Sequence, residues 1–182
     1  GIMFQYDNYG IVEQATSAFG QGVSVTAIQM ISAFSSLING GIYYEPYVVK
    51  TIRHTGTNEI LVKKEKKEVR RTISKETSEL MKVALESVVA NGSGRNAYID
   101  GYRVGGKTGT AQIPTGTGGY KDGQYILSFI GAAPMNNPKI VIYVCLDQPK
   151  NKIQYGGTVA SPIVKAVLED ALPYLNVSRQ KE

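Results

Sequence analysis

Residue types with distinctive chemistry are scarce in this 182-residue chain, which has one cysteine, one histidine and no tryptophan. One cysteine cannot form an internal disulfide bond, and Cys145 stands in an apolar run that predicts a small buried side chain. A zinc site of the usual Cys and His ligands is likewise excluded. His54 precedes a Thr-Gly-Thr-Asn sequence typical of a turn, so we expect this histidine to lie on the surface. We therefore expect no Ser-His-Asp triad. We predict neither a metal site nor a cofactor.

Long hydrophobic runs are missing as well. The longest apolar helix expected, over residues 26–39, is too short to cross a bilayer, and no signal segment is present. Hydrophobic residues make up 42% of the chain and charged residues 19%, which is typical of one globular domain or a large part of one. We place that unit at residues 1–175, followed by a polar tail at 176–182.

Positive charge is in excess by five, and it is concentrated in residues 63–71. Glutamates interleave this run and no aromatic residue lies in it, so it does not support stacking on nucleic-acid bases. We expect a solvated surface and no nucleic-acid partner. Attraction to an anionic cell-wall polymer or lipid surface is the other interpretation.

Two helices are predicted in the first half of the chain. Thr26 and Gln29 fit a capping box that opens an almost wholly apolar helix ending before Gly40, and we expect a core helix. Ser74 caps a second helix that reaches Asn91. The side chains expected to point inward from this second helix are Leu80, Val83, Ala84, Leu85 and Val88.

Strands and a last helix complete the expected fold. A small hairpin is predicted from 48–54 and 59–63, and three further strands at about 102–112, 125–133 and 139–147. A short turn makes the last two antiparallel. Ser161 and Pro162 open a final helix, whose expected inward stripe is Ile163, Val167, Leu168, Ala171, Leu172 and Leu175. This order predicts an α+β fold in which helices cover an antiparallel sheet.

Residues 101–110, Gly-Tyr-Arg-Val-Gly-Gly-Lys-Thr-Gly-Thr, match two different functional motifs. One is the phosphate-binding loop G-x-x-x-x-G-K-[ST], and the other is the K-T-G strand of penicillin-binding proteins and serine β-lactamases. A phosphate loop needs a helix that starts at its Lys-Thr. Here Gly109, Pro114 and a Gly/Thr-rich stretch follow, and they cannot sustain a helix. The strand interpretation is therefore favoured.

A strand through this motif would suit the binding of a carboxylate. Thr108 and Thr110 would lie on one face, where both hydroxyls could hold the carboxylate, with Lys107 supplying a positive field beside them. The Thr110 N–H could stabilise an oxyanion, and Gly109 would keep side-chain bulk away from the substrate. Gln112 and the loop 116–123 are further candidates to line the site. Four glycines in that loop predict the most mobile internal segment.

Four motifs in one order resemble the C-terminal part of the transpeptidase domain of class B penicillin-binding proteins. They are Gly20-Gln21-Gly22 with Thr26 and Gln29, Asn39-Gly40-Gly41 with Pro46, the run Gly105 to Gln112, and Gly156-Gly157 through Pro162. The sporulation-specific members are the nearest in pattern, and the division-type members come next.

The resemblance implies a serine D,D-transpeptidase that cross-links peptidoglycan stem peptides ending in D-Ala-D-Ala and binds β-lactam antibiotics. It implies Lys107 and Thr110 as catalytic residues, with Thr108, Gly109, Thr110 and Gln112 binding substrate. It also implies a place on the extracytoplasmic face of the cell membrane. A non-catalytic cell-wall interaction module and a nucleotide-binding protein are the alternatives.

The nucleophile of that family is not visible in these residues. Members carry S-x-x-K and then S-x-N well before K-T-G, whereas the S-x-x-K here starts at Ser178, after it, and no S-x-N occurs. Tyr6-Asp7-Asn8 fits a Y-x-N variant but lies too close to Gly20-Gln21-Gly22. We therefore expect a fragment that is inactive alone and that needs the N-terminal part of the same domain as its partner.

Overall fold

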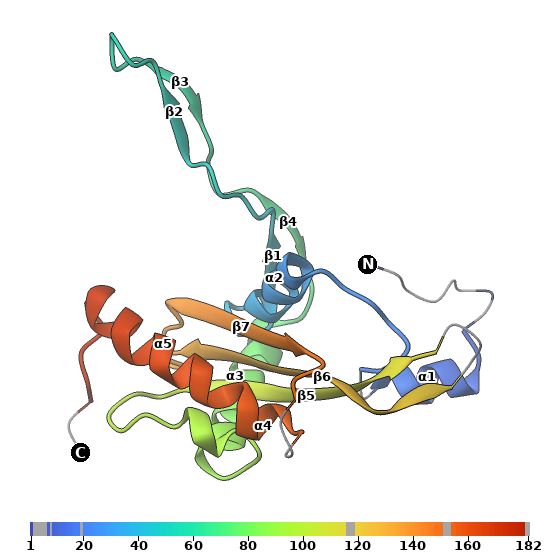
Figure 1. Ribbon diagram of the computed structural model, residues 1–182. Helices are drawn as coiled ribbons and strands as arrows, with labels where there is room; N and C mark the ends of the chain where they lie inside the picture. The colour runs from blue at the N-terminus through green and yellow to red at the C-terminus, as the bar shows by residue number, and fades with distance from the viewer. Residues whose placement is uncertain (2–6, 8, 19, 116–118, 151–153, 181–182) are drawn as a thin grey trace.

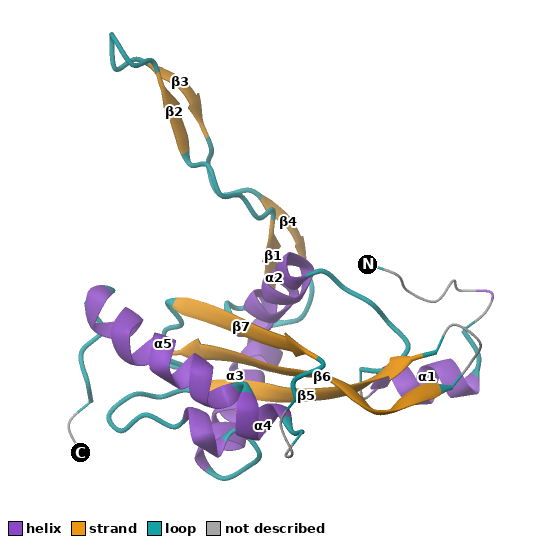
Figure 2. Cartoon of the chain, viewed as in Figure 1, coloured by secondary structure: helices purple, strands orange, loops and turns teal. Residues whose placement is uncertain are grey.

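The computed structural model describes residues 1, 7, 9–18, 20–115, 119–150 and 154–180. Three helices and a three-stranded antiparallel sheet of order β5-β6-β7 make up the body (Figures 1 and 2). The elements in chain order are α1 (Ile11–Ala18), α2 (Ala27–Ile38), β1 (Ile42–Tyr44), β2 (Thr51–Arg53), β3 (Ile60–Lys63), β4 (Glu68–Arg71), α3 (Lys75–Ala90), the 3-10 helix η2 (Arg95–Ala97), β5 (Gly105–Pro114), β6 (Tyr120–Ala133), β7 (Ile140–Asp147), α4 (Gly156–Val159) and α5 (Ser161–Tyr174). The predicted α+β class is confirmed.

Strand β6 divides the core into two layers because its side chains alternate between the faces of the sheet. Phe129 is fully buried in a cluster with Val164 and Leu168 of α5. Ile130 lies in a second cluster with Phe34 of α2 and Leu85 of α3. Helix α5 thus covers one face of the sheet, and α2 and α3 cover the other (Figure 1).

The predicted helix caps are confirmed, but the predicted inward faces are partly wrong. Thr26 and Gln29 form the capping box of α2, and the Ser74 side chain accepts a hydrogen bond from the Thr77 N–H at the start of α3. Helix α2 was expected to be a core helix, but only its second half is buried, through Phe34, Ser36 and Ile38. The sequence did not predict α1, which buries no residue, or the short pairing of β1 with β4.

Helix α3 turns Ser78 inward and leaves three predicted core residues outside. The Ser78 hydroxyl donates to the Leu37 carbonyl at 2.7 Å and accepts from the Gly40 N–H at 3.0 Å, which satisfies a polar group at zero exposure. Leu85 and Val89 share this face. Residues on the outer face are therefore exposed against expectation: Leu80, Val83 and Ala84.

Helix α5 and Cys145 require similar corrections. In α5 the buried residues are Val164, Leu168 and Leu172 together with Ser161, so the helix is rotated relative to the predicted stripe. The predicted residues that it leaves exposed are Ile163, Val167 and Leu175. Cys145 is exposed, because it lies beyond the part of β7, around Val141 and Tyr143, that packs against the α2 and α3 layer.

Residues 46–72 form an arm that extends away from the sheet (Figure 1). Its outer part is the predicted hairpin of β2 and β3, in which every residue except Thr51 is exposed. His54 lies at the turn as expected, where Nδ1 accepts hydrogen bonds from the N–H groups of Gly56 and Thr57. Within the described parts of the chain, no helix is both long enough and apolar enough to cross a membrane.

Candidate active site

The Lys-Thr-Gly-Thr motif lies in β5, at one edge of the sheet. Lys107 is opposite Ile130 of β6, Thr108 opposite Phe129 and Thr110 opposite Leu127. The prediction of an edge strand paired with β6 is confirmed. Because the strand continues to Pro114 and no helix starts at Lys107, the geometry of a phosphate loop is absent.

The two threonines share a face, as predicted, and Lys107 is on the other. Directly opposed residues of an antiparallel pair point to the same side. Thr108 and Thr110 therefore lie on the side of Phe129 and α5, whereas Lys107 lies on the side of Ile130. The Lys107 side chain is exposed, and its Nζ donates to the Thr108 carbonyl at 3.0 Å.

A cavity of about 420 Å³ opens between β5 and two loops that are distant in sequence. Its lining combines the two threonines with the segment after α3 and the start of α4: Gly92, Ser93, Arg95, Asn96, Thr108, Thr110, Tyr155, Gly156, Gly157 and Thr158. The hydroxyls of Ser93 and Thr108 are 3.1 Å apart and hydrogen-bonded. The Gly156 N–H donates to Thr110 Oγ1 at 3.4 Å. The threonine hydroxyls are thus oriented by neighbours while still facing the cavity.

Two glycines let the rear wall of the cavity approach β5. A Cβ on Gly157 would lie 2.1 Å from the Ser93 carbonyl oxygen, and one on Gly156 would lie 2.2 Å from that of Ser128. Asn96 Nδ2 donates to the Gly157 carbonyl at 2.8 Å, and the Ser161 hydroxyl donates to it at 2.6 Å. These contacts tie α4 to the segment after α3, and they set the shape of the cavity.

Gly109 is required by its neighbour on β6. A Cβ at this position would lie 2.4 Å from Ser128 Oγ, on the side of the strand away from the threonines. The sequence predicted that Gly109 leaves space for a substrate. The structure gives a second reason for a glycine here, because the Ser128 side chain needs the space. Burial raises the pKa of the nearby Tyr143 hydroxyl, and a hydrogen bond with Ser128 opposes that shift.

The other predicted lining residues that the structure describes do not line this cavity. Gln112 is half-buried further along β5, opposite Tyr125, and does not line it. Residues 120–123 belong to β6 rather than to the predicted loop. Residues 116–118 of that loop lie outside the described residues, as do Tyr6 and Asn8 of the Y-x-N match.

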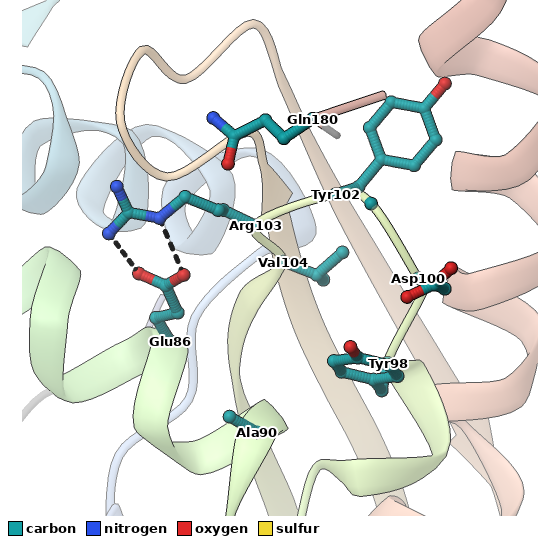
Figure 3. Close-up of a pocket in the computed structure, with 9 residues that line it drawn as sticks. Glu86, Ala90, Tyr98, Asp100, Tyr102, Arg103, Val104 and Gln180 are labelled. Atoms are coloured by element: carbon teal, nitrogen blue, oxygen red, sulfur yellow. Dashed lines mark hydrogen bonds and ion pairs between the residues drawn. The ribbon is translucent and has the colours of Figure 1, made fainter. Parts of the chain in front are cut away.

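A second cavity, of about 270 Å³, is lined by the loop before β5 and part of α3, and none of the predicted site residues lines it (Figure 3). Arg103 and Glu86 close one side of it with two hydrogen bonds of 2.7 and 2.6 Å. This pairing raises the pKa of the Arg103 guanidinium above its already high value. Since both groups are paired with each other, they have little capacity left for a ligand.

Sequence reasoning missed Ser93, Arg95, Asn96 and residues 155–158 as parts of the site. The run from Asn91 to Asp100 is loop-like and carries no motif of its own, and Gly156-Gly157 marks only the start of a helix. Nor does any group of three or more His, Cys, Asp or Glu within the described ranges have the arrangement of a metal site.

Residues 1–169 match the family described as the penicillin binding protein transpeptidase domain, and the chain belongs to that family. Over its whole length it is 51% identical to stage V sporulation protein D of Bacillus subtilis, of which it covers 28%. It is also 32% identical to the probable peptidoglycan D,D-transpeptidase PenA of Neisseria flavescens, over all of this chain and 42% of that protein. The expected similarity to sporulation-specific members is confirmed.

Solved structures agree with the fold. The transpeptidase domain of penicillin-binding protein 3 from Burkholderia pseudomallei superposes with a TM-score of 0.82 at 33% identity, over all of this chain and 52% of that one. Penicillin-binding protein 3 from Mycobacterium tuberculosis, complexed with ampicillin, gives 0.88 at 26% identity, over all of this chain and 42% of that one. The chain therefore spans about half or less of the proteins to which it is similar.

Proposed function

We propose that this chain is the C-terminal portion, residues 1–175 with a polar tail at 176–182, of a serine D,D-transpeptidase domain that cross-links peptidoglycan. The observation that carries the proposal is that Thr108 and Thr110, both in the edge strand β5, line the same cavity. Two hydroxyl donors about two residues' rise apart suit the terminal carboxylate of a stem peptide ending in D-Ala-D-Ala. An edge strand leaves alternate backbone N–H groups unpaired by the sheet, and Thr110 N–H is our candidate for the oxyanion.

In the proposed reaction, a serine hydroxyl from outside these 182 residues adds to the penultimate D-Ala carbonyl carbon. The C–N bond to the terminal D-Ala breaks, and that residue leaves as the amine with the serine proton. The amine of a stem peptide on a neighbouring peptidoglycan strand then attacks the acyl ester and returns a proton to the serine. Lys107 supports these proton transfers through its positive field. Gly109 would leave room for the substrate to lie along the edge strand, and Gln112, which does not line the cavity, would contact the substrate further along β5.

A β-lactam carries a carboxylate and a strained amide, and it would acylate the same serine. The neighbours solved with ampicillin and aztreonam support this part of the proposal. The place of action that follows is the extracytoplasmic face of the cell membrane, where peptidoglycan is assembled.

Labelling by a fluorescent penicillin tests the proposal. We expect the full-length protein to be labelled stoichiometrically and the 182-residue chain not to be, because only the former holds an activated serine. A full-length protein that carries no S-x-x-K and S-x-N before Gly1 and takes no label would favour the non-catalytic wall-binding module instead. Labelling of the short chain, lost in Ser178→Ala, would contradict the placement of the nucleophile elsewhere.

A further inference from the structure

Among the described residues that line the cavity beside Thr108 and Thr110, one carries a charge, and that residue is Arg95. The other described lining residues contribute hydroxyls, an amide and backbone groups, and none of them is an Asp or Glu. The side chain of Arg95 forms no ion pair or hydrogen bond with any described residue. A cation without a partner among the described residues, in one cavity with two hydroxyl donors, is a combination that suits an anion.

The backbone that carries Arg95 is held firmly although the side chain is exposed. Arg95 opens η2, where its N–H donates to the Gly92 carbonyl at 3.3 Å and its carbonyl accepts from Tyr98 N–H at 3.0 Å. Two residues on, Ala97 is fully buried in the core. Between them, Asn96 binds the Gly157 carbonyl across the cavity wall. The arginine thus extends from a fixed base, which lowers the entropic cost of ordering it on a ligand.

We propose that Arg95 is a specificity-determining residue whose guanidinium binds the carboxylate of the acyl donor, together with the Thr108 and Thr110 hydroxyls. The inference rests on the proposed function and assigns the charge that recognises the substrate. A guanidinium offers two parallel N–H donors that match the two oxygens of a carboxylate. Lys107 is less suited to this task, because it lies on the other face of β5 with its Nζ at the Thr108 carbonyl.

In this proposal, Lys107 and Arg95 therefore have different roles. Lys107 acts on the side of the strand where proton transfer takes place, and Arg95 acts on the side where the carboxylate is held. Loss of Arg95 should consequently affect only ligands that carry the carboxylate. Loss of Lys107 should affect all acylating ligands.

The test compares acylation of the full-length protein by penicillin G and by its methyl ester, which lacks the negative charge. We expect Arg95→Gln to lower the second-order rate constant for the acid by roughly ten- to a hundredfold, the range for one charge-assisted hydrogen bond, and to leave the rate for the ester unchanged. Arg95→Lys should recover part of the loss, since it keeps the charge without the paired donors. The matched control is Arg70→Gln, which removes an exposed arginine from β4 and should change neither rate.

Each outcome decides between the possibilities. An unchanged acid-to-ester ratio in Arg95→Gln, with a wild-type protein that is labelled, would overturn the role of Arg95 and leave the proposed function standing. An equal fall with both ligands, or a lowered urea midpoint, would show a structural role and would also overturn it. A wild-type full-length protein that neither ligand labels would overturn the proposed function, and the role of Arg95 with it.

Discussion

The arm and the sheet of this protein differ in where they place charge and apolar surface. The arm, residues 46–72, holds eight Lys and Arg against three Glu, a net of +5 that equals the formal charge of the whole chain. The rest of the chain is therefore electrically balanced. In the arm, Ile52, Ile60 and Leu61 are 46–57% exposed, whereas Leu127 and Phe129 of β6 have no exposure at all.

Stability, net charge and the candidate site therefore depend on different parts of the molecule. The arm carries the net charge, and the body provides the stability and holds the site. The free energy of folding comes from the sheet, its covering helices and the loops packed between them, because the large apolar side chains that are removed from water lie there and not in the arm. A two-stranded hairpin by itself is marginal in water. The candidate site depends on single groups in the balanced part of the molecule, so the most basic segment of the sequence is a poor guide to it.

Leucine truncation should give the largest contrast between the two regions. Leu127→Ala removes a fully buried side chain from β6 and should lower the free energy of unfolding by about 3–5 kcal/mol. Leu61→Ala makes the same chemical change on an exposed residue of β3 and should cost about 0.5 kcal/mol or less. Urea denaturation of both variants measures the difference. Similar losses in the two would mean that the arm is packed in solution.

Lysine substitutions should separate local charge from total charge. In the full-length protein, Lys107→Ala should reduce acylation by penicillin by about a hundredfold or more, the scale of one lost electrostatic contact in an active site, without altering stability. Lys66→Ala, in the arm, removes the same formal charge and should leave the acylation rate unchanged. Stopped-flow or gel-based labelling rates provide the measurement. A comparable loss in Lys66→Ala would point to a long-range effect of net charge.

Glycine substitutions should show a smaller contrast. Gly109→Ala brings a Cβ to 2.4 Å from Ser128 Oγ and should destabilise the fold by about 1–3 kcal/mol through overpacking. The variant Gly109→Ala with Ser128→Ala should recover most of that loss, because the nearest remaining contact, to Ser128 Cβ, is 3.7 Å. Gly56→Ala at the turn of the arm meets His54 only at 3.6 Å and should be tolerated. Thermal unfolding of the three variants decides the point.

The smallest effect is expected from the ion pair at the base of the arm. Lys67 Nζ lies 2.6 Å from Glu45 Oε2, and this hydrogen bond holds the pKa of the Glu45 carboxyl below its usual value. A lowered pKa stabilises the fold at pH values above the unfolded-state pKa, and that stabilisation is lost as the pH falls through the folded-state pKa. Because both groups are exposed, Lys67→Ala should return the Glu45 pKa to its usual range in an NMR titration and leave the urea midpoint unchanged.

Local patterns predicted most of the elements in the body. Ser74 and Thr26 begin helices because their side chains can bond backbone N–H groups three residues ahead, which needs no distant partner. The strand character of Lys107 to Thr110 followed from glycines and proline that exclude a helix. The face that each helix turns toward the core could not be predicted from hydrophobicity. In α3, for example, the polar Ser78 is buried, whereas the apolar Leu80 is exposed.

By itself, the sequence determined the kinds and order of the main elements, the Lys-Thr-Gly-Thr strand and the family to which these motifs point. These features depend on residues within a few positions of one another, whose spacing limits the backbone directly. Only the tertiary structure decided which face of β5 each side chain takes and that Ser93, Arg95 and Gly157 meet Thr108 and Thr110. Those contacts join segments 15 to 61 residues apart, as in the bonds from Ser93 to Thr108 and from Asn96 to Gly157. Packing of α4 and α5 on the sheet brings them together, and no local pattern of residues encodes that packing.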